Sequence, residues 1–483
     1  MKNSIGREGM DRPYSGPFKN VKLHDFVSPK TDLDRRPVFS ENLDEILDEL
    51  KLHDGMTFSF HHHMRNGDYV LPMVMKKIHE RGLKNITIAA TSLFPCHSCL
   101  VPMFEDGTVT KVNASYISGP VGVAISTGKV KEICHMTTHG GRPRSMFEGE
   151  VVVDVAFIAA PAVDEKGNLT GSEGPASCGV LGYAHVDAET AKKVVAITDY
   201  TAKTVNQPEI SGHLVDYVVK VDSIGDPKGI VSGTTQITKD PVGLKIARDA
   251  AKLIEHSGLL SNGMSFQTGA GGISLAVANE LKKIMKEKEI TGSFASGGIT
   301  DYLVNLLKEG YFEKLYDVQC FNLDAVESIK VNENHIKMSA HAYASINNPD
   351  NIVNKLDIVI LGASEIDLDF NVNVTTGSDG IILGGSGGHA DTAAGAKLSI
   401  IVSKLVNSRI SCLVDEVTTV TTPGETVDVL VTDRGIDINP KHSELIKKLK
   451  EETYLKIMDI HELKKIADYY TGIPEQRKRS DQI

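Results

Sequence analysis

Cysteine is scarce in this sequence, with six residues in a chain of 483. That number is too small for a disulfide framework, which indicates a reducing compartment. No run of about 18 apolar residues could cross a bilayer, and the first residues include no apolar segment that could act as a signal peptide. These absences predict a cytoplasmic protein with no membrane partner.

Positive charge is also limited. There are 52 Lys and Arg residues against 63 Asp and Glu residues, so the formal net charge is −11. Nucleic acid is therefore not expected as a partner, because phosphate binding needs a basic face. Any anion site should be small and local.

A metal centre is not predicted either. Cys96 and Cys99 form one CxxC motif around His97, but no second pair stands at the spacing of a zinc ribbon. A metal or redox role for this motif is the alternative, and ordinary free thiols are the interpretation we adopt.

The two halves of the chain repeat one another. DVAFIAAPAVDEKGN, which starts at Asp154, aligns without a gap with DIVILGASEIDLDFN, which starts at Asp357. Residues 54–60 are likewise similar to residues 262–268. An internal duplication is the simplest explanation.

Each half also begins with the pattern of an amphipathic helix that leads to an apolar strand. Ser40 is the expected N-cap of the first helix, and Asp240, followed by Pro241, that of the second. The apolar runs at 151–158 and 356–361 alternate with helical stretches, which is typical of α/β layers around parallel strands. We predict two related open α/β domains, residues 1–232 and 233–483, with the seam in the Gly-, Pro-, Ser- and Thr-rich stretch 224–240.

Glu365 stands where the apolar run 358–363 ends, and it aligns with Ala162 of the first half. A solvated acid at a strand end is one interpretation. Two glycine-rich turns in the same half favour a role in ligand binding. Glycine lets a ligand approach the backbone, and a helix N-terminus offers N–H groups to an anion. These turns supply the candidate thioester-binding residues Gly269, Gly271, Gly272, Gly384, Gly385, Gly387 and Gly388. A carboxylate beside backbone donors is suited to acyl transfer.

The segments ASEIDLDFNVN, FQTGAGGISLAV and GGSGGHADTAAGA resemble, in order and spacing, the coenzyme A-transferase superfamily. The resemblance implies that the acid at Glu365 is catalytic and that the loop at 384–388 lies at the CoA thioester. Within the superfamily, RPYSGPF (residues 12–18) and SFHHHMRNGDYV (residues 59–70) resemble the family of citrate lyase α subunits.

That resemblance implies a citrate CoA-transferase without a tightly bound cofactor of its own. It would act on the phosphoribosyl-dephospho-CoA arm of an acyl carrier protein, or on acetyl-CoA in its place, and release acetate as citrate is taken up. The implied partners are the β subunit (citryl-carrier lyase) and the γ subunit (the carrier protein), in an oligomeric complex.

The histidine run suggests where citrate binds. Since strand side chains alternate, His61 and His63 would point the same way if the run were a strand. Together with His62 and Arg65 they could bind a tricarboxylate, because arginine pairs with carboxylate through two hydrogen bonds. A metal site and simple packing of polar residues are the alternatives. Arg142 and Arg144 are a second candidate for anion contact, or else solvated loop charges.

Two rivals remain at this stage. An acetate-type transferase would act on free CoA esters through a covalent glutamyl-CoA intermediate, whereas the citrate lyase branch is expected to work without acylating Glu365. His389 stands where the acetate-type pattern has glutamine, which leaves the role of Glu365 open. A non-catalytic ligand sensor on the same fold is the other rival.

Overall fold

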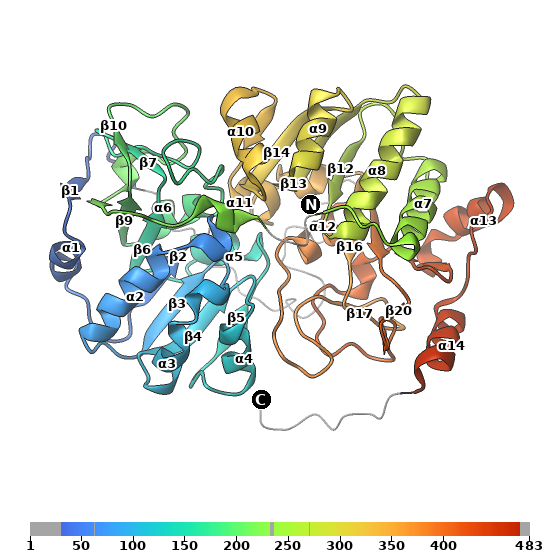
Figure 1. Ribbon diagram of the computed structural model, residues 1–483, viewed down its shortest axis with the longest axis horizontal. Coiled ribbons are helices and arrows are strands. Elements are labelled where there is room, and N and C mark those ends of the chain that lie inside the picture. Colours follow the sequence, from blue (N-terminus) through green and yellow to red (C-terminus); the bar gives the residue numbers. More distant parts are fainter. Residues whose placement is uncertain (1–29, 62, 232–235, 270, 474–483) are drawn as a thin grey trace.

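The computed structural model describes residues 30–61, 63–231, 236–269 and 271–473. The chain forms two lobes, which are called the first and second domains. They lie side by side, the first blue to green and the second yellow to red in Figure 1. Segment 12–18 and the C-terminal residues 474–483 fall outside the described residues.

The described part of the first lobe is built on an eight-stranded sheet in which every neighbouring pair of strands is parallel. In spatial order its strands are β1 (Val38–Ser40), β11 (Tyr217–Lys220), β9 (Lys193–Thr198), β6 (Val155–Ala159), β2 (Thr57–Phe60), β3 (Ile86–Ala90), β4 (Val109–Ala114) and β5 (Cys134–Met136). Its helices are α1 (Leu43–Glu49), α2 (Val70–Glu80), α3 (Leu100–Glu105), α4 (Pro120–Ser126), α5 (Gly141–Phe147) and α6 (Ala184–Thr190).

The second lobe has a matching sheet, in which only the last described pair, β22 and β23, is antiparallel. Its strands in spatial order are β15 (His335–Lys337), β14 (Phe312–Cys320), β13 (Gly292–Ile299), β12 (Ser265–Thr268), β16 (Ile358–Gly362), β19 (Leu398–Val402), β22 (Val429–Val431) and β23 (Ile436–Ile438). Its helices are α7 (Pro241–His256), α8 (Gly272–Glu287), α9 (Asp301–Lys308), α10 (Leu323–Val331), α11 (Ala340–Ala344), α12 (His389–Gly395), α13 (Ser443–Glu452) and α14 (Ile460–Thr471).

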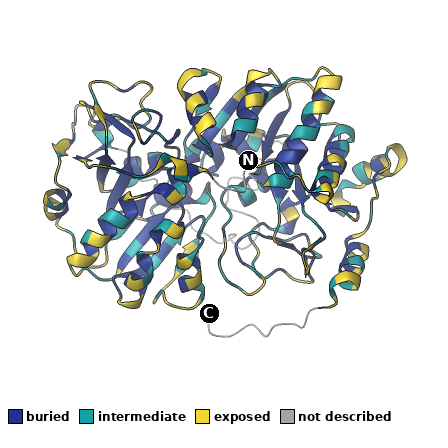
Figure 2. Cartoon of the chain, viewed as in Figure 1, coloured by how far each residue is buried: buried dark blue, intermediate teal, exposed yellow. Residues whose placement is uncertain are grey.

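The inner strands of both sheets are mostly buried and most helices expose one face, as Figure 2 shows. Both β6 and β19 are buried at every position. Strands covered on both faces need mostly apolar side chains, which explains why Ser399 is the one polar residue in the two strands.

The duplication predicted from the sequence is visible in the hydrogen bonds. Asp154 accepts a bond from the backbone N–H of Thr57 at 2.8 Å, and Asp357 accepts one from Ser265 at 2.8 Å. Each aligned segment then forms a short antiparallel hairpin outside the main sheet. These hairpins are β7 (Ala162–Asp164) with β8 (Leu169–Thr170), and β17 (Glu365–Ile366) with β18 (Val372–Asn373). Further small strands are β10 (Thr201–Ala202), β20 (Val406–Asn407) and β21 (Ile410–Ser411).

The helix starts were predicted with mixed success. Asp240 caps α7, since its side chain accepts the N–H of Gly243 at 2.9 Å. The prediction for Ser40 is wrong, because Ser40 ends strand β1 and Asn42 accepts the N–H groups of Asp44 and Glu45 instead. The predicted boundary between residues 232 and 233 falls within 232–235, outside the described residues, and stays a prediction.

Candidate active site

The carboxyl ends of the first sheet's strands face the second domain. Ser115 follows β4, and its carbonyl accepts the N–H of Gly387 at 3.2 Å. Ile117 donates to the carbonyl of Gly384 at 3.0 Å, and His139 donates to the carbonyl of Gly387 at 2.8 Å. In parallel α/β sheets this edge is where ligands bind, so the interface between the domains is the candidate site.

His61 and His63 lie directly beyond the end of β2 rather than within a strand, and both are buried. Their rings nonetheless stack, with centroids 5.5 Å apart. Neither nitrogen of either ring has a hydrogen-bond partner among the described residues, although His61 Nδ1 lies 3.5 Å from a carboxylate oxygen of Asp187. His62, the third predicted residue, is outside the described residues.

Arg65 extends the same group of donors into the interface. Its guanidinium lies over the ring of Phe94, 5.5 Å away, and over Phe321 of the second domain, 4.7 Å away. Its Nη1 is buried with no partner in the described part of the chain. The backbone of Arg65 has a φ of 51°, an unusual conformation for a residue with a Cβ and one that clusters at functional sites.

The imidazole of His63 is neutral. Burial, reinforced by the neighbouring His61, lowers the pKa of His63 well below its usual value. Burial also lowers the pKa of Arg65, but a guanidinium stays charged at any physiological pH. The group therefore offers one fixed cation and, at His63, a neutral ring that can donate one N–H bond.

Arg142 and Arg144 are neither anion contacts nor solvated loop charges. Arg142 donates to both carboxylate oxygens of Asp187, at 2.7 and 2.6 Å, inside the first domain. Although burial opposes ionisation of Asp187, this guanidinium lowers its pKa well below the usual value. Arg144 is paired with Glu148 and Glu150. Both earlier interpretations are therefore wrong, because each cation already has a carboxylate partner.

Glu365 begins β17 and is only 5% exposed. Its Oε2 accepts hydrogen bonds from the side-chain amide of Asn373 at 2.8 Å and the backbone N–H of Thr418 at 3.0 Å. Its Oε1 accepts from the hydroxyl of Thr418 at 3.3 Å. Glu365 is thus a fixed, buried acceptor rather than a solvated strand end.

The glycine-rich loop 384–388 is pressed against the first domain. A Cβ added at Gly385 would meet the backbone carbonyl of Ser115, and one added at Gly388 would meet the hydroxyl of Tyr343. The N–H groups of Gly384 and Gly387 already donate to Thr375 and Ser115. Gly385 and Gly388 are thus needed for close packing. The N–H groups of Gly384 and Gly387 are not free for an oxyanion.

The other predicted loop precedes a longer helix. Gly269 donates to the carbonyl of Ile360 at 2.8 Å, so its N–H is also in use. Gly271 is the N-cap of α8, and Gly272 is the first residue of that helix. This loop follows β12 at the carboxyl edge of the second sheet, which is consistent with the predicted location.

His389 has a structural part in the same region. Its Nε2 lies 2.8 Å from the carbonyl of Gly362 and therefore carries the proton, while its Nδ1 accepts from the hydroxyl of Thr422 at 2.7 Å. Burial lowers the pKa of His389 to about 4. A neutral histidine here joins the start of α12 to the end of β16.

Sequence reasoning missed three residues at this interface. His139 packs on Tyr183, with ring centroids 4.5 Å apart. Tyr343 accepts a bond from Gln267 at 2.7 Å, and Asp391 accepts bonds from the hydroxyl of Thr138 and the N–H of Gly140 at 2.7 and 2.9 Å. The pair Gly140-Gly141 beside His139 was an available signal, because such glycines permit close approach.

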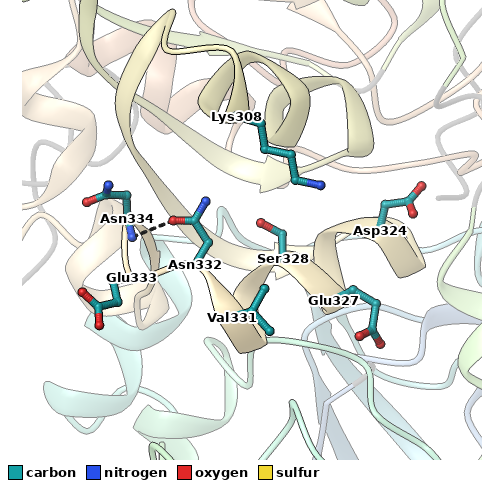
Figure 3. A pocket seen from close by; sticks show the side chains of 8 residues that line it. All are labelled: Lys308, Asp324, Glu327, Ser328, Val331, Asn332, Glu333 and Asn334. Atoms are coloured by element: carbon teal, nitrogen blue, oxygen red, sulfur yellow. Dashed lines mark hydrogen bonds between the residues drawn. The ribbon is translucent and has the colours of Figure 1, made fainter.

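Other site types find little support in the described residues. They include no group of three His, Cys, Asp or Glu side chains arranged to hold a metal ion. No helix among them has the length and apolar character needed to cross a bilayer. A surface pocket (Figure 3) contains none of the predicted site residues and is lined by Lys308, Asp324, Glu327, Ser328, Val331, Asn332, Glu333 and Asn334.

Comparison with known proteins identifies the family of this chain. The family profile described as "Citrate lyase, alpha subunit (CitF)" matches residues 36–483. The citrate lyase alpha chain of Escherichia coli K12 is 45% identical over 443 residues, which cover 92% of this chain and 87% of that protein. The Haemophilus influenzae citrate lyase alpha chain is 46% identical over 436 residues, 90% of this chain and 87% of that one.

A solved structure agrees over the whole length. The crystal structure assigned to the alpha subunit of citrate lyase from Streptococcus mutans, in complex with citrate, matches with a TM-score of 0.91 at 41% identity. The match covers 100% of this chain and 95% of that one. The fold predicted from the sequence is thereby confirmed. On the family profile and these relatives together, the chain belongs to the family of citrate lyase α subunits within the coenzyme A-transferases.

Proposed function

We propose that this chain is a citrate CoA-transferase, which exchanges the acetyl group of a thioester for a citryl group. The observation that carries the proposal is a set of buried nitrogens without a hydrogen-bond partner among the described residues: Nη1 of Arg65 and the ring nitrogens of His61 and His63. Buried polar groups that lack hydrogen bonds are costly, so a ligand that supplies acceptors is expected. A tricarboxylate offers several carboxylate oxygens, and one of its carboxylates can pair with both arms of a guanidinium.

The shielding of these donors fits a site that closes around its substrate. The nitrogens of His61 and His63 are inaccessible to solvent as the domains are placed here. Phe321, from the second domain, covers Arg65. Citrate would therefore enter when the domains separate and be enclosed when they come together, which strengthens each charged contact by excluding water.

The proposed chemistry is an exchange of acyl groups with no net proton transfer. A carboxylate oxygen of citrate attacks the acetyl carbonyl carbon, a C–O bond forms, and the C–S bond breaks as its electron pair leaves with the thiolate. The thiolate then attacks the citryl carbonyl of the mixed anhydride, and acetate leaves. Both steps place negative charge on a carbonyl oxygen, so donors at that oxygen accelerate them.

Glu365 is proposed as a catalytic residue that acts electrostatically or by orienting the substrates. Both of its oxygens accept hydrogen bonds, which ties the carboxylate in place and disfavours its use as a nucleophile. We propose that the seven glycines of the loops at 269–272 and 384–388 form the wall at the thioester. Gly385 and Gly388 hold the second loop close against neighbouring residues, because a side chain at either position would collide with Ser115 or Tyr343.

We infer that the acyl donor in the cell is the phosphoribosyl-dephospho-CoA arm of a carrier protein, with acetyl-CoA as a poorer substitute. The partners would then be the lyase β subunit and the carrier γ subunit, in an oligomeric complex in the cytoplasm. Family membership supports the complex, and the six free cysteines are consistent with a reducing compartment.

Product analysis tests the proposal directly. Purified protein given acetyl-CoA and citrate should form citryl-CoA and acetate, both detected by mass spectrometry. A panel of ¹³C-labelled acetate, succinate and tricarballylate as acceptors should give much less product than citrate, with transfer to acetate detected as labelled acetyl-CoA. Equal transfer to acetate or succinate would contradict the proposal, and so would an absence of citryl-CoA.

The acetate-type alternative predicts a covalent glutamyl-CoA intermediate. Borohydride reduction or hydroxylamine trapping during turnover would then leave a modified Glu365. We expect peptide mass spectrometry to find Glu365 unmodified.

A further inference from the structure

We propose that His139 is a catalytic residue of the citrate transfer, whose imidazole N–H donates to the carbonyl oxygen of the acyl group under attack. This inference rests on the proposed function. It goes beyond that function by naming the donor at the point where the two substrates meet.

The position of His139 between two otherwise separate regions carries the argument. On one side its ring lies 4.5 Å from that of Tyr183, whose ring stacks in turn on His63 at 6.3 Å. On the other side its backbone N–H donates to the carbonyl of Gly387 at 2.8 Å. His139 thus contacts the proposed thioester wall directly and is linked to the proposed citrate donors through the ring of Tyr183.

The ring of His139 is oriented toward that wall. A Cβ added at Gly387 would lie 3.2 Å from Nε2, so the absence of a side chain at Gly387 leaves space beside this nitrogen. Gly387 also has a φ of 51°, which further restricts the position to glycine. The opposite nitrogen, Nδ1, is buried and has no hydrogen-bond partner among the residues described.

The chemistry of an unpartnered neutral imidazole suits the task. Burial, together with the nearby Arg142, lowers the pKa of His139 to about 3, so the ring is neutral at physiological pH. A neutral imidazole keeps one N–H and can stabilise a developing oxyanion without giving up a proton. That matches a reaction with no net proton transfer.

Asp391 holds this loop in place and is a positioning residue. Its carboxylate, on α12 of the second domain, accepts bonds from Thr138 and Gly140, the two neighbours of His139 in sequence. The same helix follows directly after the glycine loop. Asp391 therefore fixes the imidazole relative to the loop at 384–388.

Three variants of His139 test the proposal with acetyl-CoA and citrate as substrates. His139→Leu replaces the imidazole donor with an apolar side chain of similar bulk. We expect kcat to fall by about 10²- to 10³-fold, as for loss of one oxyanion donor, while the Kd for citrate measured by calorimetry changes by less than about threefold. His139→Gln and His139→Asn place an amide nitrogen near Nε2 and Nδ1 respectively, and at least one should recover about tenfold over leucine.

The outcomes separate the two proposals. If the wild type forms citryl-CoA and His139→Leu is unimpaired, the inference about His139 is overturned while the proposed function stands. So would a leucine variant whose citrate Kd weakens in step with its lost activity, or two amide variants as inactive as leucine. Wild-type protein that forms no citryl-CoA would overturn the proposed function itself. The thermal unfolding temperature of each variant shows whether it is folded.

Discussion

The side-chain amide of Asn373 donates a 2.8 Å hydrogen bond to Glu365 across the paired strands β17 and β18. In the first domain the same two positions of the hairpin β7–β8 are Ala162 and Thr170. Both copies keep the hairpin, but the acid and amide occur in the second. The duplication thus supplied the scaffold, and one copy acquired the polar pair.

Replacing Glu365 tests whether the pair of Glu365 and Asn373 contributes to catalysis. Glu365→Ala should lower kcat by about 10²-fold, since it removes a fixed charge beside the proposed thioester site and releases Asn373. The measurement is the rate of citryl-CoA formation. Glu444→Ala, at an exposed position of α13, is the matched control and should behave like the wild type. Full activity of Glu365→Ala would remove Glu365 from the site.

Arg65 should determine the affinity for citrate. Arg65→Met removes the guanidinium, whose Nη1 has no hydrogen-bond partner among the described residues, and Arg65→Lys keeps the charge without the two-armed geometry. We expect the methionine variant to raise the KM for citrate by about 10- to 100-fold, with a smaller increase for lysine.

The KM for acetyl-CoA should stay nearly constant in both variants of Arg65, because the thioester is proposed to bind elsewhere. Arg248→Lys, on the exposed face of α7, controls for the substitution itself. An unchanged KM for citrate in Arg65→Met would refute the pocket.

His389 predicts how stability depends on pH. Its pKa is about 4 when folded and 6.5 as the ordinary value, so the unfolded chain binds this proton first as pH falls. The contribution of neutral His389 to the free energy of unfolding is complete above pH 6.5 and should fall by about 3 kcal/mol between pH 7 and pH 4.

Denaturant unfolding of the wild type and of His389→Gln across this range measures that contribution, with exposed His53→Gln as the control. The His389→Gln curve should be flatter than the other two. Parallel curves for all three proteins would contradict the assignment.

Gly388 should tolerate no side chain. The Cβ of Gly388→Ala would collide with the hydroxyl of Tyr343, which is buried and bonded to Gln267. We expect a lower thermal unfolding temperature and lower kcat, both partly restored when Tyr343→Phe is added. Gly362→Ala is the control, because a Cβ there would have nothing within 4 Å. Equal behaviour of the two alanine variants would contradict the packing argument.

The inferred link between Asp391 and His139 predicts non-additive effects. Asp391→Asn should lower kcat by about tenfold in the wild type, because one of the two carboxylate oxygens that accept bonds from Thr138 and Gly140 is replaced by an amide nitrogen that cannot accept. In a His139→Leu background the same substitution should change kcat little. Independent, multiplicative losses in the double-mutant cycle would show that Asp391 acts otherwise.

The features that were predicted correctly from the sequence are those that a local residue pattern encodes. The gap-free repeat from Asp154 and Asp357 predicted the two related domains, and the cap at Asp240 was found as expected. Ser40 failed because pairing with Val219 in the sheet took precedence over its capping preference.

The residues that sequence reasoning missed depend on tertiary contacts. Arg142 looked like a loop charge because its partner, Asp187, lies 45 residues away on another helix. His139 and Asp391 are 252 residues apart in the chain and adjoin only because the domains meet. No local pattern encodes such pairs, and the glycines beside His139 were the sole local sign.

A crystal structure of this protein with citrate tests the central claim most directly. We predict citrate between the domains, with carboxylate oxygens within about 2.7 to 3.2 Å of Arg65 and of His61 or His63. Citrate bound on the outer surface, for example at the pocket beside Lys308, with those donors still unpartnered, would contradict the account.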